Sequence, residues 1–211
     1  CGACHDISNP VFTLQSDGSY LPNAMDAAHP TGNMYDMMPE QRTYSEWLNS
    51  TFATEEGVTF ADDRFTDNNG GATVGSCQDC HMPKTDGGIC VFWELDDVGS
   101  RINTAEHSFI GANSWVLGAV NNLYDPTETG LSNEVIELHS QRTELLMQKA
   151  SDMDLSIENN QLNVRITNFT GHNLPTGYPE GRRMWLNIRF LDEGGGLIAE
   201  RGRYDWETAE L

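Results

Sequence analysis

Two short segments of the chain share one arrangement of thiols and imidazole. Residues 1–5 read Cys-Gly-Ala-Cys-His and residues 77–81 read Cys-Gln-Asp-Cys-His, so both are C-x-x-C-H motifs. Two thiols three positions apart can add to the two vinyl groups of one haem, and the histidine that follows can then bind the iron. The pattern predicts two covalently attached c-type haems with His5 and His81 as proximal ligands. The anchoring thiols would be those of Cys1, Cys4, Cys77 and Cys80.

Zinc binding or disulfide formation is the alternative use of these thiols. With five Cys and six His in the chain, the chance that a given Cys has Cys at +3 and His at +4 is roughly one in a thousand. Two C-x-x-C pairs could supply four thiolates to zinc, but residues 5–76 separate them, which far exceeds the usual ribbon spacing, and both pairs carry the additional histidine. Haem is therefore the favoured prediction.

Four further histidines could bind the second axial position of an iron. His107 lies among aromatic and small residues, and His172 lies in a loop stiffened by prolines and glycines, so these two are the best distal candidates. His29 precedes a proline in a turn-rich stretch and is more simply a loop histidine. His139 lies in a predicted helix, where a ligand and a core histidine are equally good interpretations. Four candidates exceed the need of two irons, so we expect one or two of them to bind haems attached to missing chain or to a neighbouring subunit.

Composition and charge restrict the class of protein. Apolar residues make up 38% of the chain and glycine occurs 20 times, so part of the core has to come from elsewhere, and haem would supply it. The net charge of −20 argues against nucleic acid or an anionic membrane surface as partner. It favours basic, cationic or metal-containing partners, or serves solubility alone. No stretch reaches the roughly 18 consecutive apolar residues of a membrane span.

The elements that would position these residues are short. Residues 6–42 are rich in turn signals and predict a wrapping loop without a long element. Thr43 begins a predicted helix, and Ser132 is the expected N-cap of a second one over residues 132–150, in which His139 shares a buried stripe with Val135. Beyond it, Leu162, Val164 and Ile166 alternate with polar residues, as do residues 184–190, and residues 197–199 are apolar again, which predicts strands.

These elements predict a loop-rich, haem-cored domain with few short α-helices, followed by a partial antiparallel β-sandwich-like module. The haem domain would span residues 1–150 and the β module residues 154–211, which is too few strands to close a sandwich. Because covalent haem is attached after export and residue 1 is itself a haem thiol, we expect a fragment of a longer periplasmic or extracellular protein. Cys90 is the one thiol left over, either buried and free or disulfide-bonded to missing chain.

Several segments carry a resemblance to a known family. They are the two haem motifs, residues 44–53 (YSEWLNSTFA), the H-x-F-x-G-x-N segment at His107, and the segment GHNLPTGYPEGRRMW at residues 171–185. Together they resemble secreted multihaem c-type cytochromes with two axial histidines per haem. The resemblance implies electron transfer between haems, onward to redox partner proteins or extracellular acceptors, or through polymeric assemblies. This chain differs in having only two haem motifs.

Electron transfer is accordingly the expected function, since two imidazoles close both faces of the iron so that no substrate binds and little rearranges on electron gain. The alternative is a multihaem redox enzyme that acts on a small nitrogen or sulfur species at an iron with one open face. A third possibility, compatible with the first, is that the β module docks the haem domain to partners.

Overall fold

The computed structural model describes residues 1–62, 64–65, 71–87, 101–178 and 182–211. The chain divides into two compact units that interleave in sequence. Unit 1 contains Cys1–Asp6 and Thr43–Asn173, and unit 2 contains Ile7–Arg42 and Leu174–Leu211. Both C-x-x-C-H motifs therefore belong to unit 1. The expected division at residues 150–154 stays a prediction, and Cys90 lies outside the described residues.

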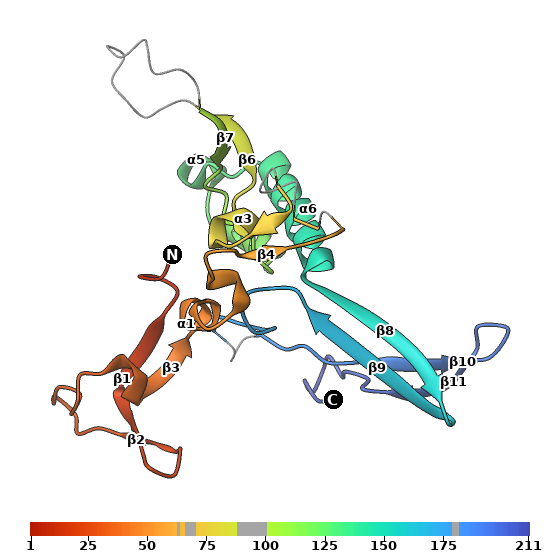
Figure 1. The fold of residues 1–211 in the computed structure, drawn as a ribbon, viewed down its shortest axis with the longest axis horizontal. Coiled ribbons are helices and arrows are strands. Elements are labelled where there is room, and N and C mark those ends of the chain that lie inside the picture. Colours follow the sequence, from red (N-terminus) through yellow and green to blue (C-terminus); the bar gives the residue numbers. More distant parts are fainter. Residues whose placement is uncertain (63, 66–70, 88–100, 179–181) are drawn as a thin grey trace. The chain divides into compact units, whose positions relative to one another are not determined.

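Unit 1 is built from short helices and two-stranded sheets (Figure 1). Its helical elements are α1 (Thr43–Leu48), η2 (Thr51–Ala53), α3 (Cys77–His81), α4 (Val116–Leu123), α5 (Pro126–Thr129) and α6 (Asn133–Ala150). Its strands are β4 (Val58–Thr59), β5 (Thr73–Val74), β6 (Lys84–Gly87), β7 (Arg101–Ala105), β8 (Ser151–Glu158) and β9 (Gln161–Asn168). Antiparallel pairs join β4 to β5, β6 to β7 and β8 to β9.

A small aromatic cluster forms the core of unit 1. Phe52, Phe65 and Val74 are buried, and Phe60 packs edge-on against Phe65 with ring centroids 5.2 Å apart. Phe169, which follows β9, contacts Phe60 edge-on at 5.9 Å. Edge-to-face aromatic pairs at these separations each stabilise by about 1 kcal/mol beyond the area they bury. The cluster therefore fixes the chain just beyond β9.

Helix α6 confirms the helix predicted over residues 132–150. Ser132 is its N-cap, and its hydroxyl oxygen accepts a hydrogen bond from the Val135 amide at 3.3 Å. The predicted buried stripe is wrong at Val135, which is 48% exposed. The helix instead buries Thr143 and half-buries His139, four positions earlier, because its inner face runs one residue away from the expected one. His139 keeps its place on that inner face.

Strands β8 and β9 form a regular hairpin without register shifts. Three directly opposed pairs put apolar side chains on the same face: Met153 with Ile166, Leu155 with Val164, and Ile157 with Leu162. Five of these six side chains are exposed and Val164 is half-buried. Alternation with period two explains the pattern, and it confirms the strand predicted from Leu162, Val164 and Ile166.

Unit 2 contains two small antiparallel sheets. One has the strand order β2 (Tyr20–Pro22), β1 (Ile7–Leu14), β3 (Met37–Gln41), with the 3-10 turn η1 (Met34–Asp36) before β3. The prediction of a wrapping loop over residues 6–42 is therefore wrong, since β1 has eight residues. It was hidden because Pro10 interrupts the pattern, and the β1–β3 register shifts twice around that proline.

The second sheet of unit 2 pairs β10 (Ile188–Leu191) with β11 (Leu197–Arg201). It confirms strands at both predicted places, although the first begins at Ile188 rather than at residue 184. Over the described residues the chain is thus a loop-rich mixture of few helices and small antiparallel sheets. Within that part of the chain, no helix is long and apolar enough to cross a membrane.

Candidate functional site

The second C-x-x-C-H motif folds as a single helical turn, α3, with its cap built into the sequence. The carboxylate of Asp79 accepts hydrogen bonds from the Gly75 amide at 3.1 Å and from the Ser76 amide at 2.8 Å. This satisfies free amides at the start of the helix, and the negative charge in its first turn suits the positive end of the helix dipole. Since helical residues three apart lie on one face, Cys77 and Cys80 face the same side.

The thiols of this motif are held neutral. Burial raises the pKa of Cys80 to about 12, and the neighbouring Asp79 carboxylate raises it further; burial is also the largest cause that raises the pKa of Cys77. Cys80 packs against the core cluster of Phe52, Phe65 and Val74. All four motif cysteines are free of disulfides. Among the described residues, no three His, Cys, Asp or Glu side chains converge as a metal site, and the choice between haem and zinc at these thiols stays a prediction.

His81 forms hydrogen bonds with Ile110 through both its backbone and its side chain. Its carbonyl accepts a hydrogen bond from the Ile110 amide at 3.0 Å, and its Nδ1 donates to the Ile110 carbonyl. Burial is the largest cause that lowers the pKa of His81, and the neighbouring His172 and His5 lower it further. A neutral imidazole whose Nδ1–H is committed to a carbonyl keeps its lone pair on Nε2, the form in which histidine binds metals.

His172 is oriented in the same way by its own loop. Its Nδ1 lies 3.0 Å from the Asn173 carbonyl oxygen, to which it donates. Its own carbonyl accepts from the Asn168 side-chain amide at 2.7 Å and from the Thr170 hydroxyl at 2.8 Å. Asn168 also accepts from the Thr170 amide at 2.9 Å, which closes a tight turn directly after β9. The lone pair of His172 is therefore also on Nε2.

The rings of His81 and His172 lie close together with nearly parallel planes. The ring centroids of His81 and His172 are 6.2 Å apart and their planes are inclined by only 24°. Near-parallel rings in face-to-face contact would be about 4 Å apart, so this is not a contact distance. Two imidazoles bound to opposite sides of one metal ion, with bonds of about 2 Å, have centroids about 6 Å apart. The centroid separation matches that of two histidines that bind one metal ion through in-plane Nε2 lone pairs.

The first motif is more exposed. Residues 1–5 form one turn, in which the amides of Cys4 and His5 donate to the Cys1 carbonyl at 3.0 and 2.9 Å. Cys1, Cys4 and His5 are exposed. The carbonyl of His5 accepts from the Tyr44 amide of α1 at 2.9 Å, which fixes the end of the turn. His5 acts on the pKa of His81, so the two motifs share one electrostatic neighbourhood.

The other three candidate histidines differ from this pair. In unit 2, the Nδ1 of His29 accepts from the Gly32 amide at 3.3 Å, and its Nε2 lies 3.0 Å from the Thr13 hydroxyl. Its proton is therefore on Nε2, the opposite tautomer to that of His81, which suits a structural histidine. His107 is exposed and packs against Phe109, with their ring centroids 4.4 Å apart. His139 is half-buried on α6. Their ligand roles stay predictions.

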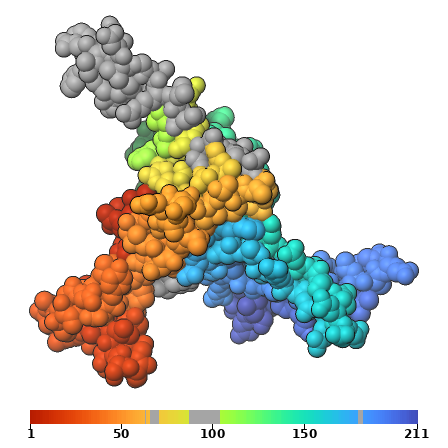
Figure 2. Space-filling model, in the orientation of Figure 1, coloured from red at the N-terminus to blue at the C-terminus, as the bar shows by residue number. Residues whose placement is uncertain are grey.

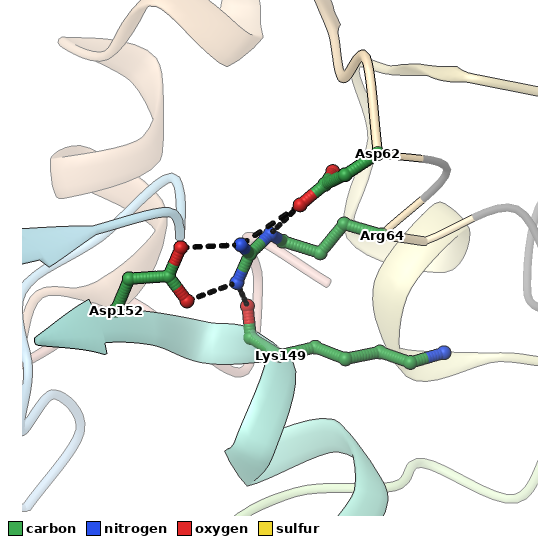
Figure 3. Close-up of polar contacts among 4 residues, drawn as sticks. All are labelled: Asp62, Arg64, Lys149 and Asp152. Atoms are coloured by element: carbon green, nitrogen blue, oxygen red, sulfur yellow. Dashed lines mark hydrogen bonds and ion pairs between the residues drawn. The ribbon is translucent and has the colours of Figure 1, made fainter.

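A half-buried arginine anchors the chain that leads to His172 (Figure 3). The guanidinium of Arg64 makes two hydrogen bonds to the Asp152 carboxylate, at 3.0 and 2.7 Å, and one to the Lys149 carbonyl at 3.0 Å. It also pairs with Asp62 at 2.9 Å and lies 4.1 Å from the ring centroid of Phe169. The Asp152 hydrogen bond is the largest cause that raises the pKa of Arg64, so the cation is permanent. Arg64 thus joins the end of α6, the start of β8 and the residue after β9.

Sequence reasoning missed the residues that orient the histidine pair. Ile110 and Asn173 act through backbone carbonyls, which no residue type reveals. Asn168 and Thr170 carry the one available signal, because an Asn two positions before a Thr amide is typical of an Asx turn. Figure 2 shows the segment near residue 170 packed against the segment of residues 43–60.

Comparison with known proteins does not identify the site. No protein-family model, no curated protein and no solved structure matches this chain. The functional argument therefore depends on the geometry of His81, His172 and the two C-x-x-C-H motifs.

Proposed function

We propose that this chain is an electron-transfer protein that carries two c-type haems, the second of them held between His81 and His172. The observation that carries the proposal is the pair of near-parallel rings 6.2 Å apart, each with its Nδ1 committed to a backbone carbonyl. Carbonyl-bound Nδ1 groups are the usual outer-shell partners of metal-binding histidines.

The bound haem would supply a reversible one-electron iron couple. The residues of the chain anchor it, orient it and shield it. Cys77 and Cys80 would hold the macrocycle through thioethers, and the axial imidazoles would close both faces of the iron. Because Ile110 and Asn173 fix the two rings, little has to move when an electron arrives, which favours electron transfer over chemistry at the iron.

The first motif would carry the other haem, at a more exposed position. Cys1 and Cys4 are its anchors and His5 its proximal ligand, while its distal ligand is one of the remaining histidines or one from a neighbouring subunit. An exposed haem beside a buried one suits exchange with a redox partner protein or an extracellular acceptor. The family resemblance supports the same role, in a secreted multihaem cytochrome of the periplasm or the cell exterior.

The small apolar core also supports a haem-cored unit. Among the described residues, the buried apolar side chains are Phe52, Phe65, Val74, Met82 and Ile110. Met82 directly follows the second motif, and Ile110 is bonded to His81. A macrocycle inserted beside them would extend this core.

The experiment is a spectroscopic count on the holoprotein. The reduced pyridine adduct should give two haems per chain, and EPR of the oxidised protein should show a low-spin ferric signal for the second haem. His172→Ala should convert that signal to high-spin, and added imidazole should restore it. His29→Ala is the matched control and should leave it unchanged.

Three results would overturn the proposal: no covalent haem, a low-spin second haem in the His172→Ala variant, or a high-spin second iron in the unmodified protein. The last result would point instead to an enzyme acting on a small nitrogen or sulfur species at an open iron face.

A further inference from the structure

Helix α1 (Thr43–Leu48) contacts the first motif along its N-terminal end. The Tyr44 amide donates to the His5 carbonyl at 2.9 Å, and the Ser45 hydroxyl donates to the Asp6 carboxylate at 2.7 Å. A Cβ atom on Gly2 would lie 2.8 Å from the Tyr44 ring. The turn of the first motif therefore packs against the Tyr44 ring at Gly2, at a distance that only glycine permits.

The same helix also contacts the loop that carries His172, which is distant in sequence. The Glu46 carboxylate accepts from the Asn173 backbone amide at 2.9 Å with one oxygen and from its side-chain amide at 2.9 Å with the other. The next residue of the helix, Trp47, also contacts this loop, because a Cβ atom on Gly171 would lie 3.0 Å from Cδ1 of Trp47. The Trp47 ring in turn stacks on Tyr44, with centroids 5.5 Å apart.

We propose that Glu46 is a positioning residue for His172, and that α1 is the common support of the first motif and of the His172 loop. The inference rests on the function proposed above and specifies how its second site is set. Asn173 is the link. Glu46 accepts a hydrogen bond from the Asn173 backbone amide, and the Asn173 carbonyl accepts the Nδ1–H of His172. The carboxylate therefore fixes the residue that orients the ring.

The residue type matters because the contact needs two acceptors. Asn173 presents two N–H donors, and a carboxylate can accept both at once. A glutamine offers one acceptor and one NH₂ donor, so at least one Asn173 donor loses its partner. Release of Asn173 lets the His172 ring rotate, and the Nδ1–H hydrogen bond that raises the basicity of a ligating imidazole weakens.

The test compares Glu46→Gln with Glu56→Gln in the holoprotein. Glu56 is exposed in the turn before β4, so its variant removes the same charge away from the site. We expect Glu46→Gln to keep two haems per chain but to bind cyanide at one iron at least ten times faster than the unmodified protein. The EPR signal of the second haem should change shape, because the relative orientation of its two axial rings changes. Glu56→Gln should match the unmodified protein in both measurements.

A milder variant keeps the inference testable if Glu46→Gln does not fold. Asn173→Ala keeps the backbone amide bond to Glu46 and loses the side-chain one, so the cyanide rate should rise by a smaller factor. Tyr44→Leu should alter the signals of both haems, because that ring contacts Gly2 and Trp47. Equal cyanide rates in Glu46→Gln and Glu56→Gln would overturn the inference, as would equal acceleration at both irons in Glu46→Gln. An unmodified protein without covalent haem would instead overturn the proposed function.

Discussion

Replacement of Arg64 is the most informative test of how unit 1 is held together. The side chain is only 10% exposed, yet it carries a full charge that serves three elements. Arg64→Met keeps the apolar stem and removes every polar contact. We therefore expect a clear loss of stability with little change in packing volume.

The magnitude follows from the contacts. Asp62 and Asp152 are 55% and 50% exposed, so each ion pair stabilises by no more than about 1 kcal/mol. The Lys149 carbonyl loses a partner, which costs about 1 kcal/mol. The cation above the Phe169 ring contributes about 1 kcal/mol. These contributions are not strictly additive, so the free energy of unfolding should fall by about 3 kcal/mol, which lowers Tm by about 10 °C for a chain of this size.

The assay is reversible chemical denaturation of the protein, followed by far-UV circular dichroism. Arg165→Met is the matched control, because Arg165 is exposed on β9 and a surface change of this kind costs less than about 0.5 kcal/mol. A loss below 1 kcal/mol for Arg64→Met, or equal losses for the two variants, would refute the assignment of Arg64 as the anchor of this region.

Three further predictions concern single positions. Gly57→Ala should destabilise the protein by more than about 1 kcal/mol in thermal unfolding, because φ is +62° and the new Cβ would lie 2.7 Å from the Val74 carbonyl oxygen. Gly118→Ala is the contrasting variant, because the new Cβ in α4 meets open space, and it should stabilise the protein by about 0.5–1 kcal/mol. Thr143→Val should raise the unfolding free energy by about 1 kcal/mol, because the hydroxyl is fully buried and has no hydrogen-bond partner within the described part of the chain; Thr143→Ser should not. Gly2→Ala should lower the haem content at the first motif alone, read by mass spectrometry of haem peptides; unchanged occupancy would mean that Tyr44 yields without cost.

The sequence predicted those features that depend on local pattern. The cap at Ser132 and the period of 3.6 residues defined α6, and alternation at Leu162, Val164 and Ile166 defined β9. His172 was a distal candidate because a rigid loop presents an imidazole well, but the sequence did not indicate which motif histidine it would approach; the structure brings it close to His81.

Features that depend on distant contacts were not predictable. Strand β1 contains Pro10 and is stable only because β2 and β3 flank it, so its own residues read as a loop. The roles of Arg64 and Glu46 arise from partners that lie 88 and 127 positions away, at Asp152 and Asn173. No local pattern encodes which carboxylate meets which donor across such separations.

The order in which unit 1 can assemble follows from the sequence distance between the two facing histidines. The helical turn at residues 77–81 is capped by its own Asp79 and needs only neighbouring residues, so it can form while the following chain is still unstructured. The partner ring arrives only after α6 and the β8–β9 hairpin have brought residue 172 back, and closing so long a loop is slow. If the proposed haem is attached, its thioethers can therefore form on an open motif, with the second imidazole closing over the iron as a late folding event.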